Sequence, residues 1–220
     1  MMNPIVRRIL TALTTAALAV CAILYAPVAC FRPVCLVLAT LAGLELVLLL
    51  LRKVRTERAK AFGAAAVFGL LLAVTFSVLP LIAQRFGNVM LLYVIAIVKI
   101  SDMGGFAFGV GAQKLRGRTH KLCPTVSPNK SWEGLFGSVF GSCLVSCAFL
   151  PVTHFGVPKA LAFGVTAALV GTLGDLIESK LKRWVGVKDS ATFMPAGLGG
   201  LLDMFDSLLL APALLLPFMR

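Results

Sequence analysis

Long apolar runs alternate with short polar islands along the whole chain. Each run is roughly 17 to 25 residues long, which is the length of a helix that crosses a bilayer. We therefore expect an all-α, polytopic integral membrane protein with about seven transmembrane helices. The predicted spans are 9–28, 34–51, 62–83, 89–112, 133–152, 159–177 and 200–219.

The composition strengthens this expectation. Hydrophobic residues make up 59% of the chain and charged residues only 14%, whereas a soluble domain carries about a quarter charged residues. The mean hydropathy is +0.96. A chain of 220 residues could not hide this many apolar side chains in one soluble core, so a soluble single-domain protein is excluded.

The basic residues predict the orientation. With the N-terminus in the cytoplasm, 16 of the 21 Lys and Arg residues fall on the cytoplasmic side, as the positive-inside rule requires. We expect a bacterial inner (cytoplasmic) membrane, and we interpret the net charge of +12 as topology plus attraction to anionic lipid. The Lys and Arg residues lie in separate loops with few aromatic residues between them, so we expect no nucleic-acid partner. The 16 are Arg7, Arg8, Arg52, Lys53, Arg55, Arg58, Lys60, Lys114, Arg116, Arg118, Lys121, Lys130, Lys180, Lys182, Arg183 and Lys188.

The acidic residues are concentrated in the second half of the chain. Seven of the nine Asp and Glu residues fall between Asp102 and Asp206. A carboxylate within or against hydrocarbon is costly, so each is a functional-site hypothesis by default. Glu45, in the middle of the second run, should face protein or water rather than lipid. The fourth run also carries Gly104, Gly105, Gly109 and Gly111, which predict close approach of a backbone or a ligand.

Asp203 and Asp206 are the best candidates for holding a metal ion. Residues three apart share a helical face, so both carboxylates can point at one ion. Oxygen ligands of this kind suit Mg²⁺, which usually takes one or two protein carboxylates together with substrate phosphates. Nearby Lys182, Arg183 and Lys188 suit phosphate oxygens. The pattern predicts metal-assisted transfer between phosphates at a membrane surface, although acids at a helix start also interact favourably with the helix dipole.

Other catalytic schemes fit the sequence badly. There is no G-x-x-x-x-G-K-[ST] motif, which excludes a P-loop. His120 and His154 have no Ser or Cys partner at a recognisable spacing, and we interpret both as surface residues. The six cysteines lack the spacing of a metal site and are interpreted as packing residues.

Several motifs, in order over about residues 100–210, resemble those of the CDP-diacylglycerol synthases, also called phosphatidate cytidylyltransferases. The run Ser179-x-x-Lys182-Arg183-x4-Lys188-Asp189-Ser190, continuing through Pro195 and Gly199-Gly200 to Asp203-x-x-Asp206-Ser207, resembles the signature of the family. Ser127-Pro128-x-Lys130-Ser131-Trp132-Glu133-Gly134 is similar to a second family loop. Gly174-Asp175-Leu176-x-Glu178-Ser179 is similar to the segment before the signature, and the helix from Ser101-Asp102 to Lys114 resembles another family motif.

This resemblance implies a CTP:phosphatidate cytidylyltransferase that makes CDP-diacylglycerol and pyrophosphate from CTP and phosphatidic acid in phospholipid biosynthesis. It implies scaffold helices over 1–88, a catalytic membrane region over 89–220, and a site formed by cytoplasmic loops and helix ends. Mg²⁺ is the implied cofactor, while a second cation and a homodimer are left open. The implied metal ligands are Asp175, Asp203 and Asp206, joined as catalytic residues by Lys188 and Asp189. The implied substrate-binding residues are Asp102, Ser127, Lys130, Glu133, Glu178, Ser179, Lys182 and Arg183.

Two alternatives stay open at this point. A CTP-dependent lipid-alcohol kinase of the polyprenol type could use a similar membrane site, and it would release CDP instead of pyrophosphate. The chain could also be a transporter or a non-catalytic membrane protein, in which Lys99 and Asp102 form a buried pair on an ion path.

Overall fold

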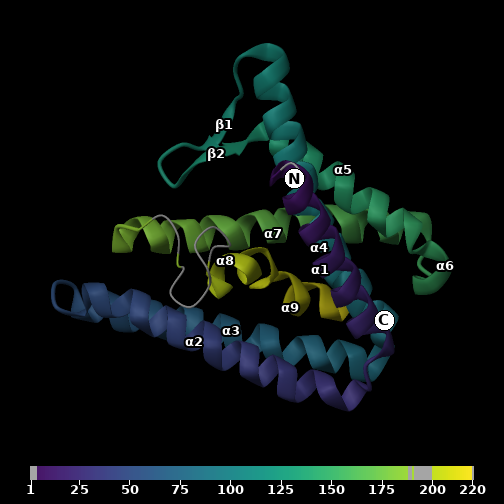
Figure 1. Cartoon of the computed structure of the whole chain (residues 1–220), viewed down its shortest axis with the longest axis horizontal. Helices are drawn as coiled ribbons and strands as arrows, with labels where there is room; N and C mark the ends of the chain where they lie inside the picture. The colour runs from purple at the N-terminus through teal and green to yellow at the C-terminus, as the bar shows by residue number, and fades with distance from the viewer. Residues whose placement is uncertain (1–3, 188–189, 191–199, 220) are drawn as a thin grey trace.

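The computed structural model describes residues 4–187, 190 and 200–219, and almost all of them are helical (Figure 1). The α-helices are α1 (Pro4–Tyr25), α2 (Phe31–Val54), α3 (Arg58–Phe86), α4 (Asn88–Arg116), α5 (Trp132–Ala148), α6 (Leu150–Thr153), α7 (Val157–Val185), α8 (Leu201–Phe205) and α9 (Ala211–Leu215). Three short 3₁₀ helices complete the set: η1 (Val28–Cys30), η2 (Asp206–Leu208) and η3 (Leu216–Met219). The strands are β1 (Lys121–Cys123) and β2 (Ser127–Ser131).

In the part of the chain that the structure describes, five segments are long and apolar enough to cross a membrane, and the chain is an integral membrane protein. They are Val28–Val54, Arg58–Phe86, Asn88–Arg116, Val157–Val185 and Leu201–Met219. The predicted count of seven spans is not confirmed: α5 has 17 residues, and in the described part of the N-terminal helix an apolar stretch is found at Ala16–Tyr25. The helical membrane fold is confirmed, with a small two-stranded sheet in addition.

The last predicted span, 200–219, is not one continuous helix. It is divided into α8, η2, α9 and η3. Two prolines, Pro212 and Pro217, lack the N–H that a continuous helix needs. Side chains of other helices bind the freed backbone groups, since Lys99 Nζ donates to the carbonyl of Met204 at 2.7 Å and Thr75 Oγ1 donates to that of Leu209 at 2.8 Å. Such interruptions are tolerated at membrane depth only where they are buried in protein.

The divided C-terminal segment lies in the middle of the molecule. Figure 1 shows α2 and α3 as an antiparallel pair along one side, α7 along the other, and α8 to α9 between them. The core includes Ile97 of α4, Ala167 of α7 and Leu215 of α9, none of which is exposed. The last predicted span therefore contributes to the centre of the protein as well as to its apolar surface.

The basic regions lie toward one end of the molecule. Figure 1 shows the turn between α2 and α3, the β1–β2 hairpin and the C-terminal end of α7 toward one end, with α6 and the C-terminus at the other. The Lys and Arg positions assigned these three segments to one side of the membrane. Which compartment this end faces stays a prediction.

Helices α4 and α5 are in backbone contact through glycines. A Cβ atom on Gly104 would lie 2.4 Å from the carbonyl oxygen of Gly137, and one on Gly137 would lie 2.5 Å from Cβ of Phe108. A Cβ on Gly105 would lie 2.4 Å from Oγ of Ser138. The predicted close approach is confirmed at Gly104 and Gly105, whereas Gly111 faces open space.

The expectation of an all-helical chain missed the hairpin that follows α4. Strands β1 and β2 are antiparallel, with Lys121 opposite Ser131. The Glu133 carboxylate accepts the His120 backbone N–H at 3.2 Å and lies 2.8 Å from Nδ1 of its ring. Ser131 Oγ caps α5 by accepting the Gly134 N–H at 3.1 Å. The hairpin thereby fixes Ser127 and Lys130 beside the helices.

The glycine contacts generate a stability prediction. Gly137→Ala places a methyl group against the backbone of α4, and we expect it to lower the free energy of unfolding by about 1–3 kcal/mol, as overpacking does. Gly69→Ala is the matched control, because a Cβ there meets nothing within 4 Å. Thermal unfolding in detergent measures both. Equal unfolding temperatures for the two variants would show that the α4–α5 contact does not require glycine.

Candidate functional site

Three carboxylates from separate parts of the chain meet at one place. Asp102 of α4, Asp175 of α7 and Asp206 of η2 each offer an oxygen within 4.8 Å of the others. Asp175 is buried, and the other two are partly buried. Three negative charges so close together repel one another, and a bound cation relieves such repulsion. We refer to Asp102, Asp175 and Asp206 as the carboxylate cluster.

Two lysines compensate part of the charge of the carboxylate cluster. Lys130 of β2 forms an ion pair with Asp175, and Lys99 Nζ lies 3.8 Å from Asp102 Oδ2. Lys99 is also held by Ser207 Oγ, to which it donates at 3.1 Å. Two ammonium groups thus face three carboxylates. This balance leaves one negative charge uncompensated by these lysines.

One oxygen of the carboxylate cluster is unpartnered. Asp175 Oδ1 is buried and has no hydrogen-bond partner among the residues that the structure describes. Leaving a buried acceptor unsatisfied costs about 1–3 kcal/mol, and more for a charged group. Oxygen-only ligand sets are those that Mg²⁺ and other hard cations prefer. The residues present therefore fit a divalent cation.

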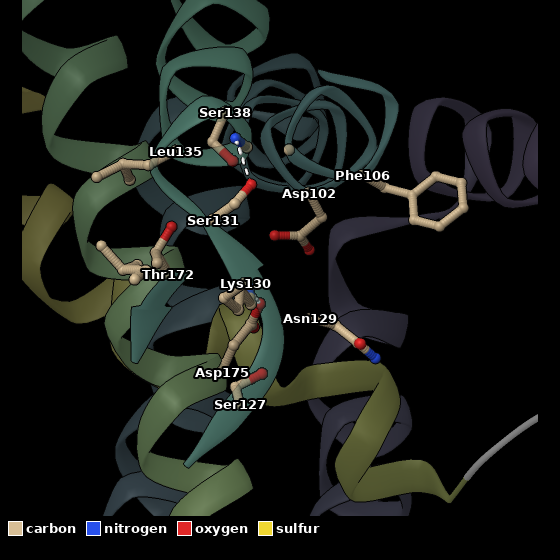
Figure 2. A pocket seen from close by; sticks show the side chains of 13 residues that line it. Asp102, Phe106, Ser127, Asn129, Lys130, Ser131, Leu135, Ser138, Thr172 and Asp175 are labelled. Carbon is tan, nitrogen blue, oxygen red and sulfur yellow. Dashed lines mark hydrogen bonds and ion pairs between the residues drawn. The ribbon is translucent and has the colours of Figure 1, made fainter. Parts of the chain in front are cut away.

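Asp102 and Asp175 of the carboxylate cluster line a cavity of about 190 Å³ between α4, α5, α7 and the hairpin. Figure 2 shows the Asp102 carboxylate pointing toward Lys130 and Asp175, whereas the Phe106 ring points away from them. Hydroxyl groups of Ser127, Ser131, Ser138 and Thr172 and the amide of Asn129 add polar groups to the lining, and Phe106, Leu122 and Leu135 add apolar ones. A cavity with cationic, acidic and hydroxyl groups in a membrane protein suits a phosphate-bearing ligand.

A second polar cluster lies along the same face of α7. Lys182 Nζ is 2.5 Å from Glu178 Oε2 and 2.6 Å from Asp203 Oδ1. Residues 175, 178 and 182 are three and four apart, which places them on one helical face. Lys182 and Glu178 are almost fully covered, with side-chain exposures of 11% and 1%. The ammonium group of Lys182 is therefore held in place by two carboxylates next to the carboxylate cluster.

Asp203 also binds the backbone at the start of α8. Its Oδ2 accepts the Gly200 N–H at 2.7 Å and the Ser190 N–H at 3.2 Å. Gly200 has no room for a side chain, since a Cβ there would lie 2.1 Å from Ser190 Oγ. Asp203 thus links Ser190 and Gly200, the described residues on either side of 191–199. Pro195 and Gly199 of the predicted motif lie outside the described residues.

The structure differs from the expectation that Asp203 and Asp206 point at one ion. That expectation assumed a continuous helix, whereas α8 ends at Phe205 and a 3₁₀ turn begins at Asp206. The change of helical period turns Asp206 toward Asp102 and Asp175, and Asp203 instead binds Lys182. The role of each residue in metal binding stays a prediction.

The other predicted site residues divide into three groups. Ser127 and Lys130 line the cavity with Asp102 and Asp175. Glu133 is bonded to His120, Arg183 is exposed and donates to the Val187 carbonyl at 3.3 Å, and Ser179 is partly buried on α7; none of the three lines this cavity. Lys188 and Asp189 lie outside the described residues.

Sequence reasoning missed four polar residues of the lining: Asn129, Ser131, Ser138 and Thr172. Thr172 had a usable signal, because it lies one helical turn before Asp175. The only sequence signal for Ser138 was its position among the glycines of α5. Small hydroxyl residues are common in membrane helices, where they bond across helices, so their number alone did not mark a site.

Glu45 faces protein, as predicted. Its side chain is 1% exposed, and its Oε2 accepts the N–H of Leu202 in the first turn of α8 at 2.8 Å. The first N–H groups of a helix have no partner within the helix. Glu45 of α2 therefore supplies an acceptor that α8 lacks, and it helps to position the two aspartates that follow.

Comparison with known proteins gives a consistent family. A model of the cytidylyltransferase family matches residues 2–220. A phosphatidate cytidylyltransferase of Staphylococcus aureus (strain COL) is 44% identical over 127 residues, which are 57% of this chain and 46% of the relative. One of Staphylococcus haemolyticus (strain JCSC1435) is 42% identical over 127 residues, with the same coverage. The matched region thus spans about half the length of these relatives.

The contact between Glu45 and α8 generates a second stability prediction. Glu45→Met keeps the volume of the side chain but leaves the buried Leu202 N–H without this acceptor, so we expect a loss of about 1–3 kcal/mol in the free energy of unfolding. Glu45→Gln keeps an acceptor oxygen and should lose less. Thr40→Ala, an exposed position on the same helix, should change stability by less than about 0.5 kcal/mol. Thermal unfolding in detergent ranks the three variants, and the ranking fails if Met and Gln behave alike.

Proposed function

The chain belongs to the cytidylyltransferase family, and we propose that it is a CTP:phosphatidate cytidylyltransferase that makes CDP-diacylglycerol and pyrophosphate. The relatives with this printed name support the proposal. The observation that carries it is the meeting of Asp102, Asp175 and Asp206 beside Lys130 in a membrane protein. Transfer between phosphates requires carboxylates that hold a cation and lysines that bind phosphates.

We assign the carboxylate cluster to a divalent cation, with Mg²⁺ as the best match to three carboxylate oxygens. When bound, such an ion neutralises negative charge that develops on the transferring phosphate. The unpartnered Asp175 Oδ1 supports this assignment. A second cation stays open, as do the predicted catalytic roles of Asp203, Lys188 and Asp189.

The residues of the chain bind and orient the two anionic substrates. Lys130 would contact phosphate oxygens from the hairpin side of the cavity, and the hydroxyls of Ser127 and Thr172 would donate hydrogen bonds to them. Lys182 would contact a phosphate from the α7 side, because Glu178 and Asp203 already fix its position. Holding the reacting groups in this way lowers the entropy cost of their meeting.

The reaction needs no strong general base. In the proposed step, a phosphate oxygen of phosphatidate attacks the α-phosphorus of CTP, and the bond from that phosphorus to the β-phosphate oxygen breaks. Pyrophosphate leaves with the electron pair of the broken bond. The attacking phosphate is already anionic at neutral pH, which agrees with a cavity whose described lining contains hydroxyls, Lys130 and carboxylates but no histidine.

The activity itself is tested with purified protein, CTP, Mg²⁺ and phosphatidate. We expect lipid-linked cytidine and pyrophosphate to appear in equal amounts, and neither to form when any one component is omitted. Diacylglycerol or a polyprenol in place of phosphatidate should give no product. If such an alcohol is phosphorylated and CDP is released, the chain is a lipid-alcohol kinase instead. Binding of CTP without turnover would indicate a non-catalytic relative.

The role of the carboxylate cluster is tested by metal titration. Asp175→Asn and Asp206→Asn remove a negative charge at constant size, and we expect a loss of roughly 10²-fold or more in turnover, since metal stabilisation contributes several kcal/mol. The Mg²⁺ concentration at half-maximal activity should also rise in both variants. Asp203→Asn should lower turnover without raising that concentration, because Asp203 binds Lys182.

Glu57→Gln is the control for loss of a carboxylate, because Glu57 lies outside the cavity and binds Lys60. Its turnover should stay near that of the unchanged protein. If Asp203→Asn raises the Mg²⁺ requirement as much as Asp206→Asn does, the metal set predicted from the sequence is the better one. A normal Mg²⁺ requirement in well-folded Asp175→Asn and Asp206→Asn would remove the carboxylate cluster from metal binding.

A further inference from the structure

A second, separate groove lies between α3 and α7. It encloses about 430 Å³, and its lining repeats at helical spacing on both walls. Positions 60, 64 and 68 of α3 are four residues apart, and positions 177, 180, 181 and 184 of α7 follow the i, i+3, i+4, i+7 pattern, so each set lies on one face. The apolar part of the lining is formed by Ala64, Phe68, Ile177 and Leu181.

The polar part of the groove lies at the ends of two membrane spans. Lys60 is two residues after the start of α3 at Arg58, and Lys180 is five residues before the end of α7 at Val185. Figure 1 shows these two helix ends at the same end of the molecule. Trp184 completes the lining. Tryptophan and lysine at the ends of membrane helices are typical of the level of the lipid headgroups.

The charge at this rim is positive. Glu57 is the carboxylate there, and it accepts a hydrogen bond from Lys60 at 2.6 Å and one from Trp184 Nε1 at 3.2 Å. The hydrogen bond from Lys60, followed by that from Trp184, lowers the pKa of Glu57. Lys53 lies 3.8 Å from the same carboxylate. Lys180 is exposed, and no carboxylate of the described part of the chain is within 4.0 Å of it.

The groove is on the opposite side of α7 from the candidate site. At 3.6 residues per turn, the centre of positions 177, 180, 181 and 184 is roughly 140° around the helix from that of 175, 178 and 182. The two linings share no residue. A ligand in this groove therefore does not occupy the cavity lined by Asp102 and Asp175, which we call the carboxylate cavity.

We propose that the groove between α3 and α7 binds an anionic phospholipid of the surrounding bilayer, at a site distinct from the carboxylate cavity. The lipid phosphate lies near Lys180 and Lys60, and an acyl chain packs against Phe68, Ile177 and Leu181. An apolar wall together with a cationic rim favours this occupant. A soluble nucleotide has no acyl chain to pack against the apolar wall, and a zwitterionic lipid has no net negative charge to attract the lysines of the rim. The proposal does not depend on the enzymatic activity.

Trp184 provides a direct readout of this groove. The chain has two tryptophans, so Trp132→Phe leaves Trp184 as the single indole fluorophore. This variant, reconstituted in vesicles, is titrated with phosphatidylglycerol or phosphatidylcholine that carries bromine on its acyl chains, since bromine quenches an indole only in contact range. We expect phosphatidylglycerol to reach half-maximal quenching at a mole fraction roughly tenfold lower than phosphatidylcholine does. This factor corresponds to a difference of about 1.4 kcal/mol in binding free energy.

Variants assign that preference to the groove. On the Trp132→Phe background, Lys60→Gln with Lys180→Gln should remove the preference for phosphatidylglycerol. Lys114→Gln with Lys121→Gln is the matched control, because it removes two exposed charges of the end of α4 and the hairpin and should leave the preference intact. Ala64→Phe fills the apolar wall at unchanged charge and should weaken quenching by both lipids. The complementary variant Trp184→Phe, which reports from Trp132, should show no tenfold preference.

Three results would overturn the proposal. Equal quenching of Trp184 by the two lipids would show that the rim does not select an anionic headgroup. Equal loss of preference in the two double variants would show general attraction of the basic protein to an anionic surface. Unchanged quenching in Ala64→Phe would show that the acyl chain does not lie in the groove.

Discussion

The structure depends on satisfying the backbone of the interrupted C-terminal segment inside apolar surroundings. A continuous helix would need no help, but 201–219 is divided into four short pieces, and each interruption exposes N–H and C=O groups that water cannot reach. Glu45, Thr75 and Lys99, from three different helices, bind the backbone of this segment. These side chains are polar residues in predicted membrane spans. Their position is explained by this one requirement, which also fixes where Asp203 and Asp206 are held.

The same physical rule explains the pairing of charges around α7. Lys182 is shared by Glu178 and Asp203, and Lys130 is bound to Asp175, so each buried cation has a carboxylate at contact distance. The carboxylate cluster is the exception, since Lys99 and Lys130 provide two positive charges for its three negative ones. A buried charge is tolerated when it is paired or coordinates a metal. The proposed cation would complete a pattern that the rest of the polar interior already follows.

The sequence predicted the membrane setting and the inward-facing Glu45 better than how the acidic residues are grouped. The apolar runs, the inward-facing Glu45 and the acidic islands follow from the high energy of charges in hydrocarbon, which can be judged residue by residue. The grouping of Asp102 with Asp175 and Asp206 could not be predicted this way, because it depends on how three distant elements pack. The pairing of Asp203 with Asp206 assumed one continuous helix, whereas the helical period changes from α to 3₁₀ at Asp206; the metal-binding role of both residues stays a prediction. The hairpin was missed because its strands are only three and five residues long.

The glycine contacts also set the spacing of two walls of the cavity. Because the backbones of α4 and α5 touch at Gly104 and Gly137, the distance between these helices is fixed by their main chains, and with it the separation of Asp102 on α4 and Ser131 at the start of α5. Helices α5 and α7 also approach closely at Gly164, where a Cβ would lie 2.9 Å from Cα of Cys143. This point is eleven residues, or roughly 16 Å, along α7 from Asp175. At this distance a change of about 5° in the tilt of α7 would displace Asp175 by roughly 1.4 Å, so the geometry of the carboxylate cluster depends on how closely α7 packs at Gly164.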